Sequence, residues 1–176
     1  MSLELILGPM FSGKSSELIR RINRYMVVYG KESVLCIKYS GDNRYSESGI
    51  ATHDRIEKNA LCVDKLSETL VSGVIKIIAI DEGQFFPEII EFTKLMILKG
   101  KKVIISGLDG DFQMKPFKYN LLELIPICDS VVKLTAICHS CKKDAPFTKR
   151  TTNDTEQTVI GGENMYHAAC RACSHK

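Results

Sequence analysis

The stretch "GPMFSGKS", residues 8–15, follows the apolar run Leu3–Leu7 and matches the P-loop pattern G-x-x-x-x-G-K-[ST]. Glycines in such a loop let backbone N–H groups turn inward around phosphate oxygens, and the N-terminus of the following helix adds its positive dipole end. A chance match in another glycine turn is the alternative, but a strand before the loop and a helix after it favour the P-loop. We expect phosphate contacts from Gly8, Pro9, Met10, Phe11, Ser12, Gly13, Lys14 and Ser15. Within this set, Lys14 would reach the outer phosphates and the Ser15 hydroxyl would bind Mg²⁺.

Around this loop, short apolar runs rich in Ile, Val and Leu alternate with stretches of helical spacing. The runs themselves do not alternate with polar residues, which is typical of strands covered on both faces. We therefore expect an α/β fold of the P-loop (RecA-like) type, with a mostly parallel sheet flanked by helices. The expected strands are Leu3–Leu7, Ser33–Ile37, Val74–Ile80, Val103–Ser106 and Val131–Leu134, and the expected helices are Ser15–Tyr29 and Pro87–Leu98.

A second acidic element is expected from "IIAIDEGQFF", residues 77–86. A buried strand that ends in an acid is the Walker B pattern, so Asp81 would hold the same Mg²⁺ through water. Glu82 adds a neighbouring carboxylate with two uses: activating water for ATP hydrolysis, or taking a proton from a substrate hydroxyl. The motif does not choose between these uses. The base-reading motif N-K-x-D of switch GTPases does not occur in the chain.

Two C-x-x-C pairs follow the last expected strand, and residues 142–169 separate them. This spacing is typical of a four-thiolate zinc ribbon with no vacant ligand position, so we expect a structural zinc. Histidines nearby could replace a cysteine, but four cysteines are the simpler set: Cys138, Cys141, Cys170 and Cys173. The remaining cysteines, Cys36, Cys62 and Cys128, lie in apolar surroundings and are expected to be core thiols.

The cysteine pairs also divide the chain. We expect residues 1–137 to form the nucleotide-binding α/β domain and residues 138–176 a small zinc-binding lobe. The polar segment 147–170, with Gly161 and Gly162 in its middle, has two interpretations that the composition leaves open. It is either a lid over a substrate, held at its base by zinc, or a solvated β-ribbon that completes the lobe.

Composition narrows the function classes. The chain has 176 residues and a formal net charge of +3, which is mild for a protein that coats nucleic acid or an anionic membrane. No apolar run reaches the length of a membrane span, and the N-terminus lacks the pattern of a signal peptide, so we expect a cytoplasmic protein. The competing classes are a zinc-ribbon nucleic-acid ATPase and a non-catalytic nucleotide sensor. The first would need a more basic chain, and Glu82 argues against the second.

Several stretches occur in an order that resembles the type II thymidine kinase family of animals, bacteria and large DNA viruses. They are "GPMFSGKSSELIRR", "DNRY", "THD", "DEGQFFPEI", "LDGDFQMKPF", "VVKLTAIC", "CKKDAPFTKR" and "VIGGENMYHAACRAC". The similarity runs from about Leu3 to Cys173. It implies ATP-dependent phosphorylation of the 5′-hydroxyl of thymidine to thymidine monophosphate, in deoxynucleoside salvage for DNA synthesis. It also implies a homotetramer, inhibited by thymidine triphosphate, with no nucleic-acid or membrane partner.

The resemblance assigns roles by position. Glu82 would be the general base, and Asp42, Arg44 and Gln84 would join the set that handles the triphosphate and its metal. The nucleoside pocket would be lined by Met10, Phe85, Leu108, Phe112, Thr148 and Tyr166. Val159, Ile160 and Gly161 fall where the family's lasso loop binds the base through its main chain. Asp111 departs from the family pattern, and we expect it to alter access to the pocket.

Overall fold

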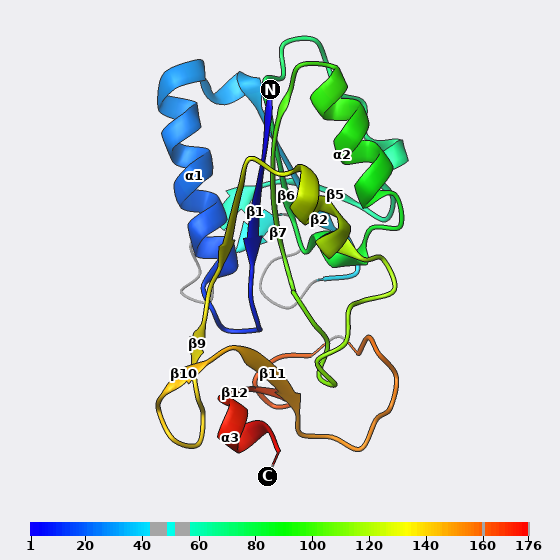
Figure 1. Ribbon diagram of the computed structural model, residues 1–176. Helices are drawn as coiled ribbons and strands as arrows, with labels where there is room; N and C mark the ends of the chain where they lie inside the picture. The colour runs from blue at the N-terminus through cyan, green and yellow to red at the C-terminus, as the bar shows by residue number, and fades with distance from the viewer. Residues whose placement is uncertain (43–48, 52–56, 160, 176) are drawn as a thin grey trace.

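A six-stranded parallel sheet forms the body of the protein. The computed structural model describes residues 1–42, 49–51, 57–159 and 161–175. The strand order is β5-β2-β6-β7-β1-β8, and every neighbouring pair runs parallel, as the sequence predicts (Figure 1). The strands are β1 (Ser2–Leu7), β2 (Val34–Tyr39), β5 (Leu61–Val63), β6 (Ile77–Asp81), β7 (Lys102–Gly107) and β8 (Ser130–Lys133).

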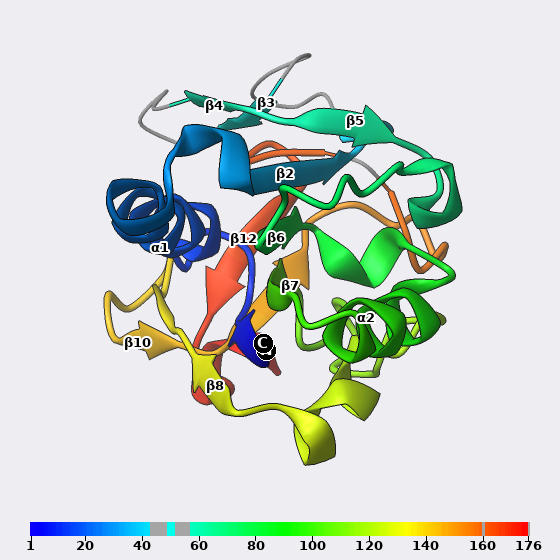
Figure 2. The same cartoon turned by 90° about the horizontal axis from the view of Figure 1, so that it is seen from above.

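Helices cover the two faces of this sheet (Figure 2). On one side α1 (Lys14–Tyr29) packs Leu18 and Ile22 against the sheet, because its apolar residues recur at helical spacing. On the other side lie α2 (Ile89–Leu98) and the 3₁₀ helix η4 (Leu121–Ile127). The central strand β6 is buried at all five positions, which explains its uninterrupted apolar sequence. Among the described residues, none of the helices combines the length and apolarity needed to cross a bilayer.

A small lobe lies beyond the carboxyl ends of the sheet strands (Figure 1). Its strands form two antiparallel pairs, and a single helical turn, α3 (Arg171–Ser174), ends it. The pairs are β9 (Ala136–Ile137) with β10 (Asp144–Ala145), and β11 (Phe147–Arg150) with β12 (Tyr166–Ala169). The long connection between β11 and β12, residues 151–165, is called the lasso below. A β-ribbon thus forms the base of the segment, as one of the two interpretations expects, and the lid over a substrate stays a prediction.

Some elements differ from the sequence-based expectations. The prediction that every strand is covered on both faces is wrong for β8, where Val131 is 47% exposed because β8 is the edge strand. The helix predicted from Pro87 begins two residues later, at Ile89. The short strand β5 was not predicted, nor was the antiparallel pair β3 (Gly49–Ala51) and β4 (Glu57–Asn59). Further short 3₁₀ helices are η1 (Lys31–Ser33), η2 (Leu66–Glu68) and η3 (Gly83–Phe85). Among the expected core thiols Cys36 is buried, whereas Cys62 and Cys128 are only half-buried.

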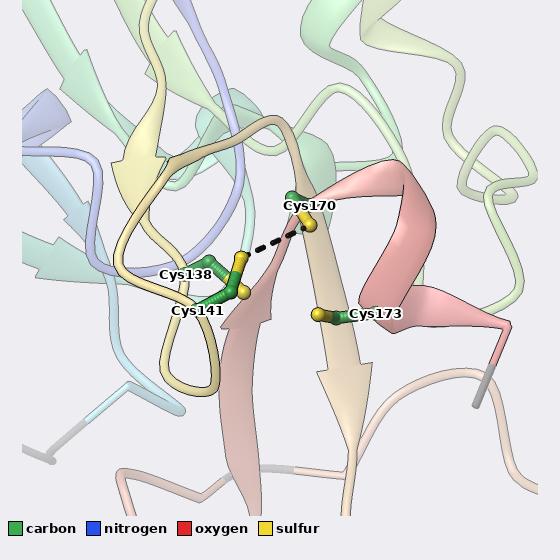
Figure 3. Close-up of side chains that lie close together, drawn as sticks. All are labelled: Cys138, Cys141, Cys170 and Cys173. Carbon is green, nitrogen blue, oxygen red and sulfur yellow. Dashed lines mark hydrogen bonds between the residues drawn. The ribbon is translucent and has the colours of Figure 1, made fainter.

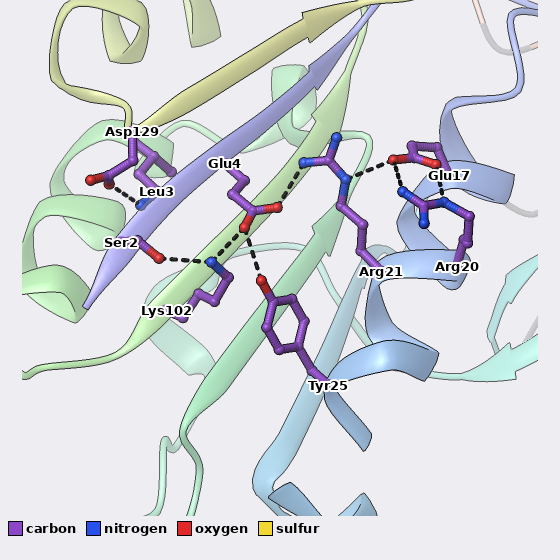
Figure 4. A network of polar contacts seen from close by, with 9 residues as sticks. All are labelled: Ser2, Leu3, Glu4, Glu17, Arg20, Arg21, Tyr25, Lys102 and Asp129. Carbon is purple, nitrogen blue, oxygen red and sulfur yellow. Dashed lines mark hydrogen bonds and ion pairs between the residues drawn. The ribbon is translucent and has the colours of Figure 1, made fainter. Parts of the chain in front are cut away.

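A polar network ties α1 to strands β1 and β7 of the sheet (Figure 4). Glu4 of β1 accepts hydrogen bonds from Arg21 Nη1 at 2.7 Å and from the Tyr25 hydroxyl at 3.0 Å, and it pairs with the Lys102 ammonium of β7. Burial opposes ionisation of Glu4, but the hydrogen bonds from Lys102 and Arg21 outweigh it and lower the pKa of the carboxyl group. One side chain therefore joins β1, β7 and α1.

We predict that Glu4→Gln lowers the free energy of unfolding at pH 7 by about 1–3 kcal/mol, because two half-buried cations lose their anionic acceptor. The folded-state pKa of Glu4 lies below its ordinary value of 4.5, so its contribution is present above that value and disappears as the pH falls through the folded pKa. The gap between wild type and variant should therefore narrow in acid. Urea unfolding of wild type and variant at pH 7 and at an acidic pH below the folded-state pKa of Glu4 tests this. Glu91→Gln, on the exposed surface of α2, is the control. A gap that widens in acid would contradict the assignment.

Candidate active site

The P-loop connects β1 to α1 in the geometry that the sequence predicts. Gly8 has a φ of +150°, and a Cβ there would lie 2.6 Å from the Leu134 carbonyl oxygen, so only glycine fits beside β8. Gly13 has a φ of +79° and precedes the first residue of α1, Lys14. Lys14 is 7% exposed as a residue, and its ammonium group donates to the Pro9 carbonyl oxygen at 2.7 Å. The amine thus lies over the loop that is expected to hold phosphate.

A cavity of about 760 Å³ opens over this loop, which is ample for a nucleoside triphosphate. Residues 10–16 line it on one side and Asp81, Glu82 and Lys38 on another. The small lobe closes it with residues that include His139 and His167. Gly8 and Pro9 lie outside this lining, next to it along the chain. We call this space the P-loop cavity.

Two oxygen ligands suitable for a hard divalent cation meet at the floor of the P-loop cavity. The Ser15 hydroxyl donates to Asp81 Oδ2 at 3.0 Å, and the Ser106 hydroxyl donates to Asp81 Oδ1. Burial raises the pKa of Asp81 to about 6, and the neighbouring Glu82 charge adds to the rise. A cation at this point would offset both effects. Hydroxyl and carboxylate oxygens are the donors that Mg²⁺ prefers, so these residues fit the ion.

Glu82 is held in an unusual conformation beside Asp81. Its φ of +54° lies in the left-handed region, which non-glycine residues rarely adopt. Gln84 fixes its side chain: Nε2 donates to Glu82 Oε2 at 2.6 Å, and Oε1 accepts the Leu108 N–H at 2.9 Å. Gln84 is only 1% exposed and lines neither cavity, so it lies behind Glu82 and not at the phosphates. The expectation of a direct phosphate contact from Gln84 is thereby corrected.

A second, narrower cavity lies beside the first, and all of the expected pocket residues that the structure describes line it. Further lining residues went unnoticed at the sequence level, among them Phe117, whose ring packs edge-on against Phe85 with centroids 6.0 Å apart. The cavity has a volume of only about 30 Å³, well below that of an ordinary small-molecule site, so a flat heterocycle that contacts this aromatic lining requires the lining to open. The expected residues found there are Met10, Phe85, Leu108, Phe112, Thr148, Val159, Gly161 and Tyr166. We call it the aromatic cavity.

The two cavities share a wall made by Met10, Asp42 and Tyr166. Asp42, expected near the triphosphate, is 7% exposed and faces both spaces. A group bound in one cavity therefore lies next to a group bound in the other. Arg44 and Ile160, the two remaining expected site residues, fall outside the described part of the chain.

Asp111, which the sequence analysis expects to alter access to the pocket, is one of the residues that line the aromatic cavity. It is 6% exposed, and its Oδ1 accepts the N–H groups of Gln113 and Lys115 at 2.8 and 2.9 Å. Its Oδ2 accepts Gln157 Nε2 of the lasso at 2.8 Å. Asp111 thus connects the loop after β7 to the lasso across the cavity.

The four expected zinc ligands converge in the small lobe (Figure 3). Their sulfur atoms all lie within 4.8 Å of one another, close to the roughly 3.8 Å edge of a zinc–thiolate tetrahedron. Backbone N–H groups of Cys141 and Cys170 lower the pKa of Cys138 to about 6, whereas hydrogen bonding with Cys170 and Cys141 raises the pKa of Cys173 to about 12. Four cysteine sulfurs at this spacing can form a tetrahedral metal site, and the set fits Zn²⁺. The nearby His139 and His167 rings instead stack on each other at 4.1 Å.

Comparison with known proteins agrees with this geometry. The family model described as "Thymidine kinase" matches residues 1–174. The chain is 52% identical over 172 residues to a thymidine kinase of vaccinia virus (strain Western Reserve), covering 97% of this chain and 95% of the relative. It is 51% identical, with the same coverage, to thymidine kinases of monkeypox virus and of variola virus (isolate Human/India/Ind3/1967). The chain therefore belongs to the thymidine kinase family.

Proposed function

We propose that the protein transfers the γ-phosphoryl group of ATP to the 5′-hydroxyl of thymidine and so forms thymidine monophosphate. The observation that carries this proposal is the shared wall of Met10, Asp42 and Tyr166 between the P-loop cavity and the aromatic cavity. A hydrolase needs only the first cavity and a water molecule. A second, aromatic-lined cavity beside the P-loop supports transfer to a heterocyclic acceptor.

On the donor side, the P-loop N–H groups and Lys14 would bind the phosphates, and Asp42 would lie near the γ-phosphate, with Arg44 also assigned there by the resemblance. Ser15 and Asp81 would hold Mg²⁺, which supplies charge neutralisation for the transferred phosphoryl group when bound. The Lys14 ammonium would exchange its hydrogen bond to the Pro9 carbonyl for a phosphate oxygen, a stronger, charge-assisted partner.

On the acceptor side, Phe85 and Phe112 would contact the faces of the pyrimidine, with Leu108 and Met10 filling the remaining apolar wall. The base edge would be read by main-chain groups of the lasso around Val159, Ile160 and Gly161. The Val159 carbonyl oxygen already accepts the Tyr166 hydroxyl at 2.7 Å, so one of its lone pairs is used within the protein. Thr148 also lines this cavity, and its oxygen accepts the Met10 N–H at 2.9 Å.

Glu82 would act as the general base. The 5′-oxygen attacks the γ-phosphorus, the hydroxyl proton passes to the Glu82 carboxylate, and the bond to the β-phosphate oxygen breaks to release ADP. The Gln84 amide donates to the carboxylate at 2.6 Å, which fixes the orientation of the Glu82 side chain.

We further propose a role in cytoplasmic deoxynucleoside salvage, with feedback inhibition by thymidine triphosphate. That inhibitor would fit by placing its nucleoside in the aromatic cavity and its phosphates at the P-loop, because the cavities adjoin. A homotetramer, a structural zinc, and the division into residues 1–137 and 138–176 belong to the same proposal.

The competing function, a nucleic-acid ATPase, predicts hydrolysis stimulated by single-stranded DNA. Incubation with ATP, Mg²⁺ and either thymidine or DNA separates the two.

Glu82→Gln should reduce kcat by roughly 10²–10⁴-fold, since the amide cannot accept the hydroxyl proton. The affinities for ATP and thymidine should change little, because the substitution keeps the side-chain shape. Steady-state kinetics combined with equilibrium binding of each substrate measures both effects, and Glu123→Gln, on the exposed side of η4, is the charge-matched control. Near-normal turnover in Glu82→Gln would remove this carboxylate from the mechanism.

Cys141→Ser should lose the metal and loosen the lobe, because metal binding supplies folding free energy to small lobes of this kind. Thymidine affinity should fall because the lobe carries Thr148, Tyr166 and the lasso. The readouts are zinc per chain by elemental analysis and thymidine binding by calorimetry. Cys128→Ser, half-buried and outside the cluster, is the matched control. Well-folded wild-type protein without zinc would contradict this proposal.

A further inference from the structure

Arg150, the last residue of β11, is a buried cation that the proposed mechanism does not use. It is 8% exposed, and among the described residues no carboxylate lies within ion-pair distance of its guanidinium group. Arginine is rarely buried without such a partner, because desolvation of its charge is costly. Its surroundings must therefore compensate for the charge by other contacts.

Those contacts are main-chain carbonyl groups of the lasso. Arg150 Nη1 donates to the Asp154 carbonyl oxygen at 2.9 Å and also to that of Glu156, and Nη2 donates to that of Gln157 at 3.2 Å. Three carbonyl groups within four residues thus turn toward one guanidinium. Because the fork of donors is planar and rigid, it determines how this part of the lasso curves.

The same guanidinium also contacts the wall of the aromatic cavity. Its Cζ lies 3.9 Å from the centroid of the Phe112 ring, and Nη2 donates to the Tyr166 hydroxyl oxygen at 2.8 Å. The Tyr166 hydroxyl in turn donates to the Val159 carbonyl oxygen at 2.7 Å. Arg150 therefore connects an aromatic wall residue, a residue of the shared wall and the part of the lasso proposed to read the base.

We propose that Arg150 is a positioning residue for the nucleoside acceptor: its guanidinium folds the lasso onto Phe112 and Tyr166 and so shapes the aromatic cavity. This inference rests on the proposed function, since it names the group that organises the acceptor site. Arg150 lines neither cavity, so it acts through its neighbours and not by touching the substrate.

If Arg150 only positions the acceptor site, its removal should weaken nucleoside binding and leave the chemical step unaffected. The Arg150 contacts lie in the lasso and the aromatic wall. The groups proposed for the chemical step have other partners: Lys14 bonds to Pro9, Asp81 to Ser15, and Glu82 to Gln84. Removing the guanidinium should therefore weaken thymidine binding in the ground state and the transition state alike. Such a loss raises KM and leaves kcat nearly unchanged.

The test compares Arg150→Met, which keeps a long apolar chain but no donors, with Arg150→Lys, which keeps the charge but not the fork. Both variants should raise the KM for thymidine by about 10- to 100-fold, since several charge-assisted hydrogen bonds are lost, with kcat within about 3-fold. ATP affinity measured without thymidine should be unchanged. Amide exchange across residues 151–159 should accelerate in the free protein. Arg171→Met, at an exposed arginine over the Phe147 ring, is the control.

Two results would overturn the proposal. One is an unchanged KM together with unchanged exchange in the lasso. The other is a parallel loss of kcat, ATP affinity and thermal stability, which would make Arg150 a general structural residue. Tyr166→Phe provides a second check, because it removes the hydroxyl that accepts from Arg150 and donates to Val159, and it should raise the KM for thymidine in the same direction by a smaller factor. The exchange experiment needs no substrate, so its outcome stands even if wild-type protein fails to phosphorylate thymidine.

Discussion

The hydrogen bond from the Met10 N–H to Thr148 Oγ1 is the contact on which the arrangement of the site depends. It is 2.9 Å long and buried, and it joins residues 138 positions apart in the chain. Met10 belongs to the P-loop and Thr148 to β11 of the small lobe. A second contact also joins the P-loop to the lobe. The Phe11 side chain packs against the apolar cluster of the lobe that contains the zinc-site residues Cys138 and Cys170. The P-loop is therefore held from above by the lobe as well as from below by the sheet.

This constraint explains why the two cavities adjoin. The sheet alone would present a P-loop open to solvent, as any strand–loop–helix unit does. The lobe adds Thr148 and Tyr166 next to Met10; all three line the aromatic cavity, and Met10 and Tyr166 also line the P-loop cavity. The backbone of Phe11, with a φ of +65°, adopts a conformation that non-glycine residues rarely take. The packing of the lobe against its side chain stabilises that conformation. The lobe is thus part of the active site and not an appendage.

Much of the sheet and half of the site followed from local sequence patterns. The P-loop, the Asp81–Glu82 pair and the four cysteines carry fixed spacings, and uninterrupted apolar runs mark buried parallel strands such as β6. The short strands β3, β4 and β5 have three residues each, too few for a periodic signal. The position of β8 at the edge of the sheet could not be predicted either, because an apolar run does not indicate whether the strand has a neighbour on one side or on both.

The rest of the site depends on contacts between distant segments, which spacing does not reveal. The residues that line the aromatic cavity are spread along the chain between Met10 and Tyr166, and only the family resemblance indicated that they lie together. The family resemblance placed Gln84 with the residues that handle the triphosphate, whereas in the structure its side chain bonds to Glu82 and to the Leu108 N–H. No sequence pattern indicated a role for Arg150, because most of its partners are main-chain carbonyl groups, which every residue has.

Separate equilibrium binding of ATP and of thymidine to Thr148→Val tests most directly whether the lobe and the P-loop form one site. Valine keeps the shape of the side chain but cannot accept the Met10 N–H, and Thr148→Ser restores the acceptor. The account predicts that both affinities fall together in Thr148→Val, each by about 5- to 30-fold for a buried donor left without a partner, and that Thr148→Ser retains both. Unchanged ATP affinity in Thr148→Val, with only thymidine binding reduced, would contradict it.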